Sequence, residues 1–381
     1  MEWQNYLTCN KKKTNEASSI SEDVRHKLYN DLYETLTHPS PIITNQNERK
    51  LIWYIQRETK KHNVNNITRT KAYLQFFNRH KEIHWALLAH MVSRNGGYNM
   101  TDLKSSLIGR LLADKEKEKL FHFLERANAL IFQDAYPQLL LYEISKRENT
   151  SLFHLLPALR ITKFMIPVWE HFLLSSNSQL LTLALITNEQ QYVEKHLINF
   201  TITKEIFKTF TYVMQEKLGL THVIFPYKRY PFLRNYSLAG IEVRDFSSVQ
   251  ERIKIGKQLY SILFSKLCFD SIVHFANHVS HTASRSDYWP HFFSKQLQDN
   301  RIIYSPSLVD AWDNVSHHFS HHLDWFTDIT LIKGFERGMI VENGDLTKEV
   351  KHDLHMLAAL GKLTPIQFPE KKKEITSISS K

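Results

Sequence analysis

The chain has 381 residues, with 49 Lys and Arg against 39 Asp and Glu, which gives a formal net charge of +10. Its 10 glycines and 11 prolines are few for this length, and this disfavours turn-rich sandwiches, glycine-rich nucleotide-binding folds and low-complexity chains. The two cysteines, Cys9 and Cys268, lie far apart and fit neither a disulfide framework nor a thiolate metal cluster.

Hydrophobic spacing and capping residues predict helices through the first half of the chain. After a polar segment at 1–20, helices are expected at 21–36 and 47–62, then from a cap at Thr68 or Asn66 to residue 95 and from a cap at Asn99 or Thr101 to residue 112. Further helices are expected at 114–132, 136–147, 162–175, 178–198 and 204–218. The pair Gly96-Gly97 predicts the end of the third of these helices, because glycine readily adopts the left-handed conformation that closes a helix. Pro137 predicts a restart at the sixth helix.

The second half of the chain begins with its longest stretch without helical spacing. Residues 221–245 predict an ordered aromatic loop or a short hairpin. Ser248 and Glu251 have the spacing of a capping box, which predicts a helix to about Phe264. The remaining elements are expected to be a helix at 266–281, a helical stretch from Pro306 or Ser307 that includes 314–325, strand character at 329–341, and a last helix from Asp345 or Thr347 to just before Gly361.

These elements predict an all-α fold, a multi-helix globular array around a continuous core with little or no strand. The length allows one large domain or two subdomains. The expected divisions are a mobile segment at 1–20, an N-terminal helical region at 21–220, an ordered loop at 221–247, a C-terminal helical region at 248–365 packed on the first, and a disordered tail at 366–381.

No targeting or membrane-spanning segment is expected. The sequence begins MEWQNYLTCNKKK, without the charged-then-apolar pattern of a signal peptide, and it has no apolar run of about 18 residues. The nearest candidate, 164–187, is interrupted by Pro167, Glu170, His171 and a polar stretch at 175–179. These features predict a cytoplasmic protein.

The excess positive charge favours attraction to nucleic acid, anionic lipid or acidic partners. Much of it lies in the short runs Lys11–Lys13, Lys60–Lys61 and Lys371–Lys373. Runs this short at termini and helix ends are usually solvated, and the basic residues do not alternate with aromatic residues as a nucleic-acid stacking platform requires. A nucleic-acid partner is therefore only an alternative expectation.

A first polar cluster lies within 66–110, inside what otherwise resembles a core helix. Burying a polar group without a partner costs about 2–7 kcal/mol, so His84, His90, Arg94 and Asn95 must be hydrogen-bonded, ligated or functional. Arg94 also offers a fork for an anion beside the next helix N-terminus. Alternatively, Arg94 caps the last carbonyls of its own helix and Asp102 lies favourably in the first turn of the next helix, with no ligand.

A second polar cluster, HVSHTASRSDYWPH at 278–291, follows an apolar helix. His281 and His291 have side chains suited to acid–base chemistry near neutral pH. Arg285 and Asp287 are close enough in sequence to form an ion pair that fixes the loop. A tied-down connection between helices explains these residues equally well.

Histidines recur one helical turn apart in several places, at His80/His84, His274/His278, His317/His321 and His318/His322. That spacing presents two imidazoles on one helix face, as helical metal sites do. With 21 histidines such pairs arise by chance, and none lies in an HExxH context. No metal site is predicted, and the cofactor is left open.

Four blocks of the sequence, NITRTKAYLQFF, HWALLAHMVSRNGGYNMTDL, SVQERIKIGKQLYSILFS and HTASRSDYWPHFF, resemble the YppC-like family of unknown function (domain of unknown function 2515) of Bacillus-type bacteria. The resemblance extends from about Asn47 to Gly361. It implies a bacterial, cytoplasmic protein without a signal sequence, and it implies no particular activity, substrate or cofactor. The run HHFSHH at 317–322 is not part of it.

The favoured functional hypothesis brings the two polar clusters together in one internal pocket that binds a small anionic ligand or, with a metal, supports hydrolysis. The catalytic candidates are His84, His90, His281, Asp287 and His291, and the ligand-binding candidates are Arg94, Asn95 and Arg285. The alternatives are a non-enzymatic helical interaction module that binds nucleic acid or an anionic surface, and a structural scaffold whose polar groups only fix helix packing.

Overall fold

The computed structural model describes residues 21–38, 45–106, 112–198, 222–230, 235–243, 248–297, 303–319, 323–341 and 344–363. These residues form the predicted all-α fold, with two small β pairings. The helix expected at 204–218 lies outside the described residues, as do 1–20 and 366–381. No helix in the described ranges is long and apolar enough to cross a membrane.

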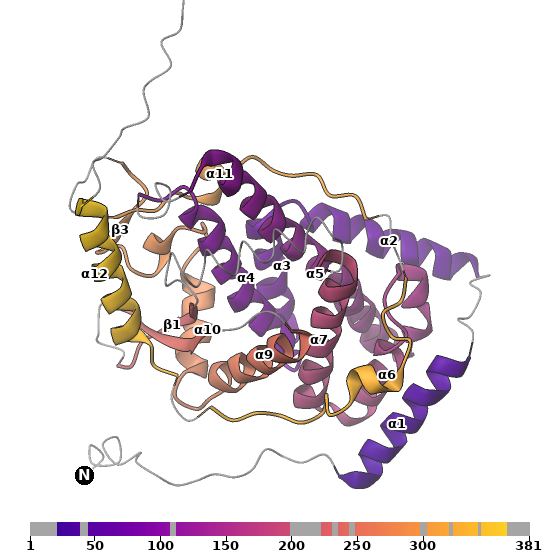
Figure 1. Ribbon diagram of the computed structural model, residues 1–381. Coiled ribbons are helices and arrows are strands. Elements are labelled where there is room, and N and C mark those ends of the chain that lie inside the picture. The colour runs from indigo at the N-terminus through magenta and orange to yellow at the C-terminus, as the bar shows by residue number, and fades with distance from the viewer. Residues whose placement is uncertain are drawn as a thin grey trace, which may run out of the picture.

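The central helix of the fold is α4 (His84–Asp102). It contacts α3 (Asn66–Arg79), α5 (Asp114–Glu148), α7 (Ser178–Val193) and α9 (Val249–Leu263), which Figure 1 shows around it. Its buried residues fall on all sides of the helix, and they include polar and charged side chains. Because these side chains cannot reach bulk water, their hydrogen-bond partners must come from neighbouring elements.

The helix predicted at 68–95 is in fact two helices, α3 and α4, and its predicted end at Gly96-Gly97 is wrong. α4 continues through both glycines, so no separate helix begins near Thr101. A Cβ atom on Gly97 would lie 2.4 Å from Asn66 Oδ1 and 2.8 Å from His281 Nε2. Glycine at this position therefore permits close packing and does not form a turn.

α5 is one 35-residue helix where the sequence predicts two. Pro137 lies inside it and is buried, so the predicted restart there is wrong. α5 packs against α2 (Gln46–His62), α3, α4 and α7. Packing on this scale outweighs the backbone hydrogen bond that a proline removes.

The other helices of the N-terminal half confirm their predictions to within a few residues. α1 (Glu22–Thr37) and α2 match 21–36 and 47–62, and α6 (Met165–Ser175) matches 162–175. α7 continues directly into a short π-helix, Glu194–Ile198, and together they match 178–198.

The described part of 221–247 forms a hairpin, one of the two forms expected. β1 (His222–Tyr227) pairs antiparallel with β2 (Ser237–Glu242), with Ile224 opposite Gly240. β1 contacts α4 and α10 (Phe269–His278), and β2 contacts α9 and α12 (Thr347–Leu363). The hairpin therefore links the central helix to the C-terminal elements at the left of Figure 1.

The start of α9 confirms the predicted cap, because the Ser248 side chain accepts a hydrogen bond from the Glu251 backbone N–H. α10 is shorter than the helix expected at 266–281. A 3-10 turn at Arg285–Asp287 follows, and β3 (Phe293–Ser294) pairs in parallel with β4 (Ile303–Tyr304). α12 begins at one of the two expected residues but runs past Gly361, so its predicted end is wrong.

The helix predicted to include 314–325 is wrong. α11 covers only Leu308–Ala311, and the described residues that follow, up to 319, are not helical. The Trp312 ring stacks on Phe121 of α5 with centroids 4.2 Å apart, and Arg126 donates to the His318 carbonyl at 2.8 Å. These contacts with α5 take the place of local helical hydrogen bonds.

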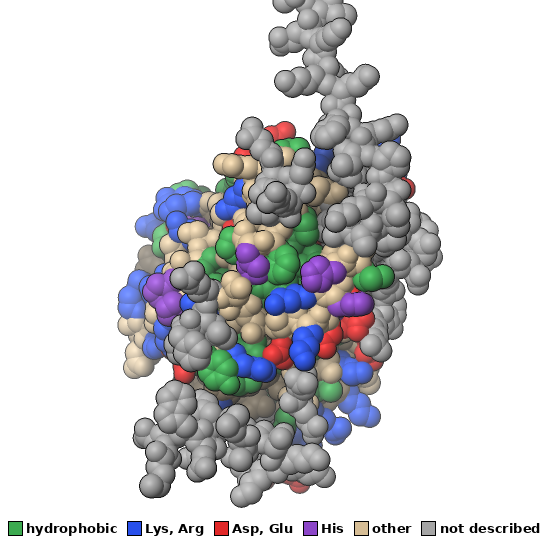
Figure 2. Space-filling model, turned by 90° about the vertical axis from the view of Figure 1, so that its left-hand side faces the viewer, with side chains coloured by type: hydrophobic (Ala, Val, Ile, Leu, Met, Phe, Trp, Pro, Cys, Tyr) green, Lys and Arg blue, Asp and Glu red, His purple; other side chains and the backbone are tan. Residues whose placement is uncertain are grey.

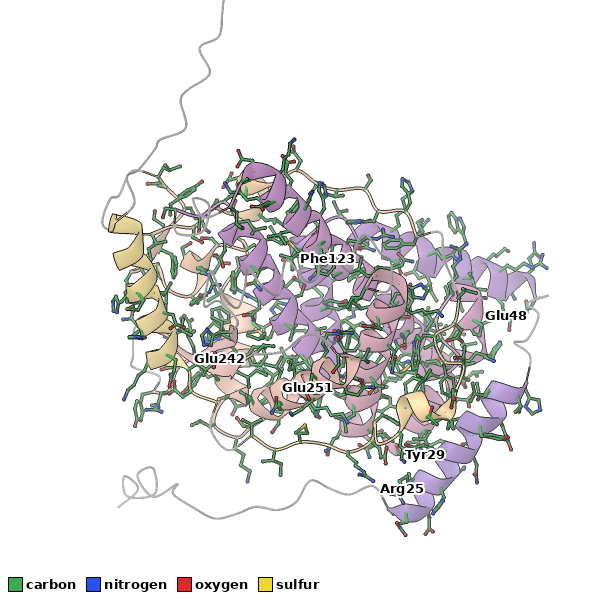
Figure 3. The ribbon with its side chains drawn as sticks, viewed as in Figure 1. Arg25, Tyr29, Glu48, Phe123, Glu242 and Glu251 are labelled. Carbon is green, nitrogen blue, oxygen red and sulfur yellow. The ribbon has the colours of Figure 1, made fainter. Side chains whose placement is uncertain are left out.

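The strand character predicted at 329–341 is also wrong, because the described residues there contain a 3-10 turn, Ile329–Ile332, and no strand. The segment at 329–341 is instead fixed by contacts with α1. Tyr29, which Figure 3 labels on α1, has its hydroxyl 3.0 Å from the Glu336 carboxylate, and it accepts a hydrogen bond from the Gly334 N–H at 3.3 Å.

Candidate functional site

The two polar clusters of the sequence meet beside the C-terminal half of α4. Arg285 contacts Asp102, Arg94 lies 3.9 Å from Asp287, and His281 Nε2 lies 2.8 Å from Asn66 Oδ1. We call the residues that these contacts join the buried cluster; its members are Asn66, Ser93, Arg94, Tyr98, Asp102, His281, Thr282, Arg285, Asp287 and Tyr288. The sequence segments at 66–110 and 278–291 thus form one structure.

Arg285 is paired with a residue other than the one predicted. Its Nε and Nη2 donate to the Asp102 carboxylate at 2.7–2.9 Å, and its Nη1 donates to the Tyr288 hydroxyl at 2.7 Å. The predicted Arg285–Asp287 ion pair is therefore wrong. The reason is the 3-10 turn, in which the Asp287 carboxylate accepts hydrogen bonds from the backbone N–H and hydroxyl of Thr282.

Arg94 caps the end of a neighbouring helix. Its Nη1 donates to the carbonyl of Val279, the residue that ends α10, at 2.8 Å, and its guanidinium lies over the Phe275 ring, 4.5 Å from the centroid. Its Nε donates to the Tyr98 hydroxyl at 3.3 Å. A cation at a helix C-terminus compensates the partial negative charge of the unpaired carbonyls.

His281 is neutral in this environment. Its Nε2 donates to Asn66 Oδ1, because the Asn66 amide nitrogen already donates to Ser93 and Asn128, and its Nδ1 accepts the Ala283 N–H. Burial lowers the pKa of His281 to about 4. Burial alone would raise the pKa of Asp287, but contacts with His281 and Thr282 hold it below the ordinary value.

His90 and Asn95 are buried on α4 and bind backbone groups. His90 Nδ1 donates to the Thr70 carbonyl at 2.8 Å, its Nε2 has no partner among the described residues, and burial lowers its pKa. The Asn95 amide donates to the Ile224 carbonyl at 2.8 Å and accepts the Ile224 N–H at 2.9 Å. Asn95 therefore fixes β1 against α4.

The other two predicted site residues have contacts outside the buried cluster. His84 Nδ1 lies 2.9 Å from the Tyr260 hydroxyl, the His84 ring stacks on Phe264, and burial lowers the pKa of His84 to about 4. His291 is exposed, and its ring contacts Phe292, which in turn contacts His355 of α12. Figure 2 shows histidine, lysine and arginine side chains mixed on the face that includes α12.

A pocket of about 170 Å³ lies next to the buried cluster, between α3, α4, α5, α7 and α9, with Val223 of β1 at its edge. Most of its lining is apolar, including Trp85, Leu88, Val92, Ile131, Ile186 and Leu259. Two polar lining residues, Ser93 and Asn128, connect it to the buried cluster, because both hydrogen-bond the Asn66 amide at 3.1–3.2 Å. The pocket and the cluster therefore share a wall.

Two polar side chains of this pocket stand out from the rest of its lining. Tyr73 is 2% exposed, and its hydroxyl has no hydrogen-bond partner among the described residues. Burial raises the pKa of the Glu189 carboxyl to about 7, against hydrogen bonds from Trp85 and Gln190, and Asp134 nearby raises it further. Burial also raises the pKa of Tyr73, and the Glu189 charge adds to this effect.

Asp134 is a second buried carboxyl close to Glu189, although it does not line the pocket. Its Oδ2 accepts hydrogen bonds from Asn188 and Gln138, and its Oδ1 has no partner among the described residues. Burial raises its pKa to about 7. A buried carboxyl with such a pKa is neutral for about half of the molecules near pH 7.

Tyr73, Glu189 and Asp134 are not among the site residues predicted from the sequence. One signal was available for Asp134, since it stands alone among apolar residues in ALIFQDAYPQLLLY. Glu189 follows the apolar run LLTLALI in the same way. Tyr73 has no such signal, because a tyrosine at a core-facing helical position is common and only the structure shows whether its hydroxyl has a partner.

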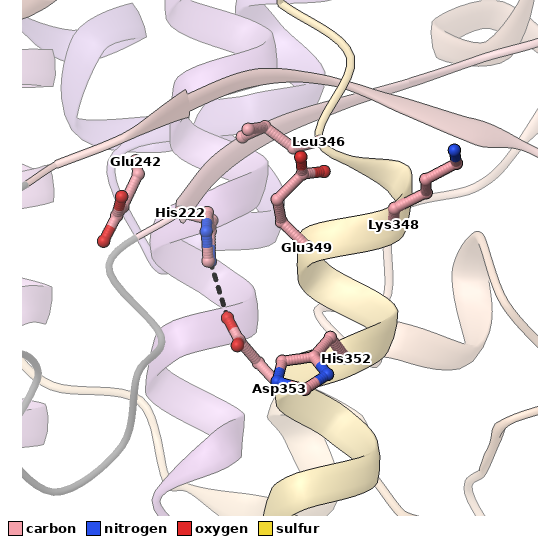
Figure 4. A pocket seen from close by; sticks show the side chains of 7 residues that line it. All are labelled: His222, Glu242, Leu346, Lys348, Glu349, His352 and Asp353. Carbon is pink, nitrogen blue, oxygen red and sulfur yellow. Dashed lines mark ion pairs between the residues drawn. The ribbon is translucent and has the colours of Figure 1, made fainter.

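A second hollow of about 420 Å³ lies on the surface between the hairpin and α12. Figure 4 shows His222 facing Asp353 across it, with Nδ1 and Oδ2 3.8 Å apart, and Glu242, Glu349 and His352 around them. Burial lowers the pKa of His222. This pair is looser than a hydrogen bond, and the hollow has no buried polar group without a partner among those described.

The histidine pairs do not converge on a metal site in the described part of the chain. No group of three or more His, Cys, Asp or Glu side chains there is placed to hold a metal ion. His80 ends α3 whereas His84 begins α4, so the two do not share a helix face. The rings of His274 and His278 stack with centroids 4.0 Å apart, and His321 and His322 lie outside the described residues.

Fold and site together define an all-helical protein with a densely paired polar core next to a small, mostly apolar pocket. A family model described as "Protein of unknown function (DUF2515)" matches residues 61–344. The chain is 39% identical to "Uncharacterized protein YppC" of Bacillus subtilis (strain 168) over 314 residues, which is 82% of this chain and 94% of that protein. The chain therefore belongs to this family. No solved structure matches it.

Proposed function

We propose that the protein binds a small, largely apolar molecule with one polar end in the pocket between α3, α4, α5, α7 and α9. The observation that carries this proposal is the Tyr73 hydroxyl, which is buried at the pocket wall without a hydrogen-bond partner among the described residues. An unpaired buried hydroxyl costs free energy, and a ligand that bonds it recovers that loss. A cavity of about 150 Å³ lined by apolar side chains is large enough for benzene.

The proposal places the ligand beside the buried cluster and not among its charged members. The Arg285 guanidinium hydrogen-bonds Asp102 and Tyr288. The Arg94 guanidinium hydrogen-bonds the Val279 carbonyl and the Tyr98 hydroxyl. Neither guanidinium has its fork directed to an open space that could hold an anion. Asn95, His281 and Asp287 then act as positioning residues that hold β1 and the loop after α10 against α4.

A titration with cyclohexylmethanol, followed by isothermal calorimetry on the full chain, tests the proposal. We expect saturable binding to the natural chain, and Tyr73→Phe is expected to weaken it about fivefold, the equivalent of one neutral hydrogen bond. Ala89→Phe, which fills the pocket, is expected to abolish binding. The matched control is Val309→Phe on exposed α11, which should bind as the natural chain does. Binding that survives Ala89→Phe unchanged would overturn the proposal.

A second candidate function, association with an anionic membrane surface, has one supporting feature on α2. Trp53 and Tyr54 are exposed there, and the Arg57 guanidinium lies 4.9 and 5.8 Å from their ring centroids. Exposed aromatic rings with basic neighbours suit the headgroup region of anionic lipid. Sedimentation with vesicles of phosphatidylglycerol tests it. Binding at low salt that is lost on Trp53→Ala supports it, whereas no binding at low salt, or tighter binding to single-stranded RNA, contradicts it.

A further inference from the structure

We infer that the pocket selects a small apolar amine, whose ammonium group binds between the Glu189 carboxylate, the Tyr73 hydroxyl and the rings of Tyr73 and Trp85. This inference rests on the proposed function and adds the charge and chemical class of its ligand. The inferred ligand charge is positive, whereas the sequence favoured an anionic ligand.

The charge balance around Glu189 favours a cationic ligand. Its carboxylate receives hydrogen bonds from the neutral donors Trp85 and Gln190, and among the described residues no salt bridge reaches it. The cation on the same side of the pocket, Arg252, is already engaged, because it pairs with Glu194 and donates to Gln190. A carboxylate in a mostly apolar wall without a cation is the complement of a ligand that carries a positive charge.

The further charge that acts on Glu189 is also negative. Asp134 on α5 acts on Glu189 in the direction that opposes ionisation. It too has no salt bridge from the described residues, and its Oδ1 has no partner there. A carboxylate ligand would meet the Glu189 carboxylate in this wall, the negative charge of Asp134 nearby, and a guanidinium that is already paired with Glu194. An ammonium ligand would instead be attracted by both carboxylates, and its positive charge would favour the ionised forms of Glu189 and Asp134.

The hydrogen-bond donors of an ammonium group match the acceptors of the pocket. A primary ammonium has three N–H donors and no acceptor. The pocket offers it the Glu189 oxygens and the unpartnered Tyr73 oxygen, which can accept one of the N–H groups. Tyr73 and Trp85 lie edge-to-face with centroids 5.4 Å apart, and both line the pocket. Aromatic faces attract a cation by about 0.5–2 kcal/mol, most strongly where water is excluded.

The remaining lining requires an apolar body on the ligand. This lining consists of apolar side chains, namely Leu88, Val92, Ile131, Ile186, Ile255 and Leu259. At Gly256 of α9 a Cβ atom would lie 2.6 Å from Ile186 Cγ2, so α7 and α9 approach closely at this point. The volume of about 170 Å³ limits the ligand to roughly one ring or a short branched chain. Polyamines and nucleosides are too long or too polar for such a lining.

The binding is expected to depend on pH through Glu189. The groups that face it are Tyr73 of α3, Trp85 of α4, Asp134 of α5 and, through Gln190, Arg252 of α9. Burial raises the pKa of Glu189 to about 7 in the free protein, so the carboxylate is fully available only above that pH. A primary alkylammonium keeps its proton over this range, because its pKa lies near the lysine value of about 10.4. Amine affinity should therefore rise from about pH 5.5 to about pH 8.

Three probes of one shape test the inference: cyclohexylmethylamine, cyclohexylmethanol and cyclohexanecarboxylate, titrated by calorimetry into the full chain. We expect the amine to bind at least about tenfold more tightly than the alcohol near pH 8 and the carboxylate not to bind. The preference should shrink near pH 5.5. Glu189→Gln should remove the preference near pH 8, whereas the control Glu251→Gln, which removes a carboxylate outside the pocket, should keep it.

The other possible orders of affinity among the three probes each contradict a specific part of the proposal. If the alcohol binds as tightly as the amine, the inferred charge is wrong while the proposed pocket stands. If the carboxylate binds most tightly, the ligand is an anion. If none of the three binds, the proposed function fails and the inference fails with it. Should Glu189→Gln not fold, the amine-to-alcohol ratio of the natural chain at the two pH values decides the question without it.

Discussion

The buried cluster and the pocket lie side by side and share Ser93 and Asn128 at their common wall, yet their polar groups differ in how they are paired. In the cluster each charged side chain has a charged or backbone partner at close distance, as Arg285 has in Asp102 and Arg94 has in Val279. Among the described residues of the pocket, the Tyr73 hydroxyl lacks a partner and Glu189 accepts hydrogen bonds only from neutral donors.

This contrast separates stability from function. Paired buried charges fix one arrangement of helices, and removing one partner is costly. Unpaired polar groups at a cavity wall lower stability in the absence of a ligand, and they are tolerated where they contribute to binding. The two regions should therefore respond in opposite ways to the same kind of substitution.

The largest expected effect comes from breaking a pair in the cluster. Arg285→Met leaves the Asp102 carboxylate buried without its cation, and we expect a loss of about 3–5 kcal/mol in the free energy of unfolding. Urea denaturation measures it. The double variant Arg285→Met, Asp102→Leu should recover much of the loss. A single-variant loss below about 1 kcal/mol would show that the pair is not buried as described.

A somewhat smaller effect is expected from crowding the cluster. In Gly97→Ala the new Cβ collides with Asn66 Oδ1 and with His281 Nε2, and overpacking of this kind costs about 1–3 kcal/mol. The adjacent Gly96→Ala is the control, because its Cβ would lie 3.0 Å from Asn128 Nδ2 and 3.9 Å from Asn66 Nδ2, without the closer contacts found at Gly97. Equal stabilities of the two variants in thermal unfolding would contradict the close packing at Gly97.

Most of the fold was predictable from the sequence, because helical spacing and caps are local signals. The cap at Ser248 shows this. The wrong predictions arise where packing overrides a local signal, at Gly96-Gly97 and at Pro137 inside buried helices, and where contacts with α5 hold 312–319 in a non-helical form. No local pattern records these contacts.

The candidate site was predictable only in part for the same reason. Polar residues in an apolar stretch identified the segments at 66–110 and 278–291, which do meet. Sequence spacing assigned Asp287 as the partner of Arg285, since it could not show that α4 brings Asp102 closer. The pocket is lined by residues of five helices and of β1, such as Tyr73 of α3 and Glu189 of α7, and only the packing of those elements brings them together.

A pH effect of about 1–2 kcal/mol is expected from Asp134. Burial raises its pKa to about 7, so the folded state keeps a proton that the unfolded chain releases near pH 4. This proton contributes stability at low pH that is lost as the pH rises from about 4 to about 7. Asp134→Asn should therefore gain stability relative to the natural chain between about pH 5 and about pH 8, by about 1–2 kcal/mol. A difference between the two chains that does not change with pH would contradict this.

The smallest expected effect compares one tyrosine from each region. Tyr98→Phe removes a hydroxyl that accepts a hydrogen bond from Arg94, and it should lose about 0.5–1.5 kcal/mol. Tyr73→Phe removes a hydroxyl without a partner in the described structure, and its stability should stay within about 0.5 kcal/mol of the natural chain or rise. Guanidinium denaturation of both variants measures the difference. The reverse order would show that Tyr73, and not Tyr98, is the satisfied group.

The most direct test of the account is the pKa of the Glu189 side chain, measured by ¹³C NMR and assigned by its absence from the spectrum of Glu189→Gln. We predict a pKa of about 7 in the free protein, because the carboxyl is buried without a cation from the described residues. With saturating cyclohexylmethylamine the pKa should fall by at least about one unit. An ordinary value near 4.3 in the free protein, unchanged by the amine, would contradict the claim that this pocket holds an uncompensated acid for a cationic ligand.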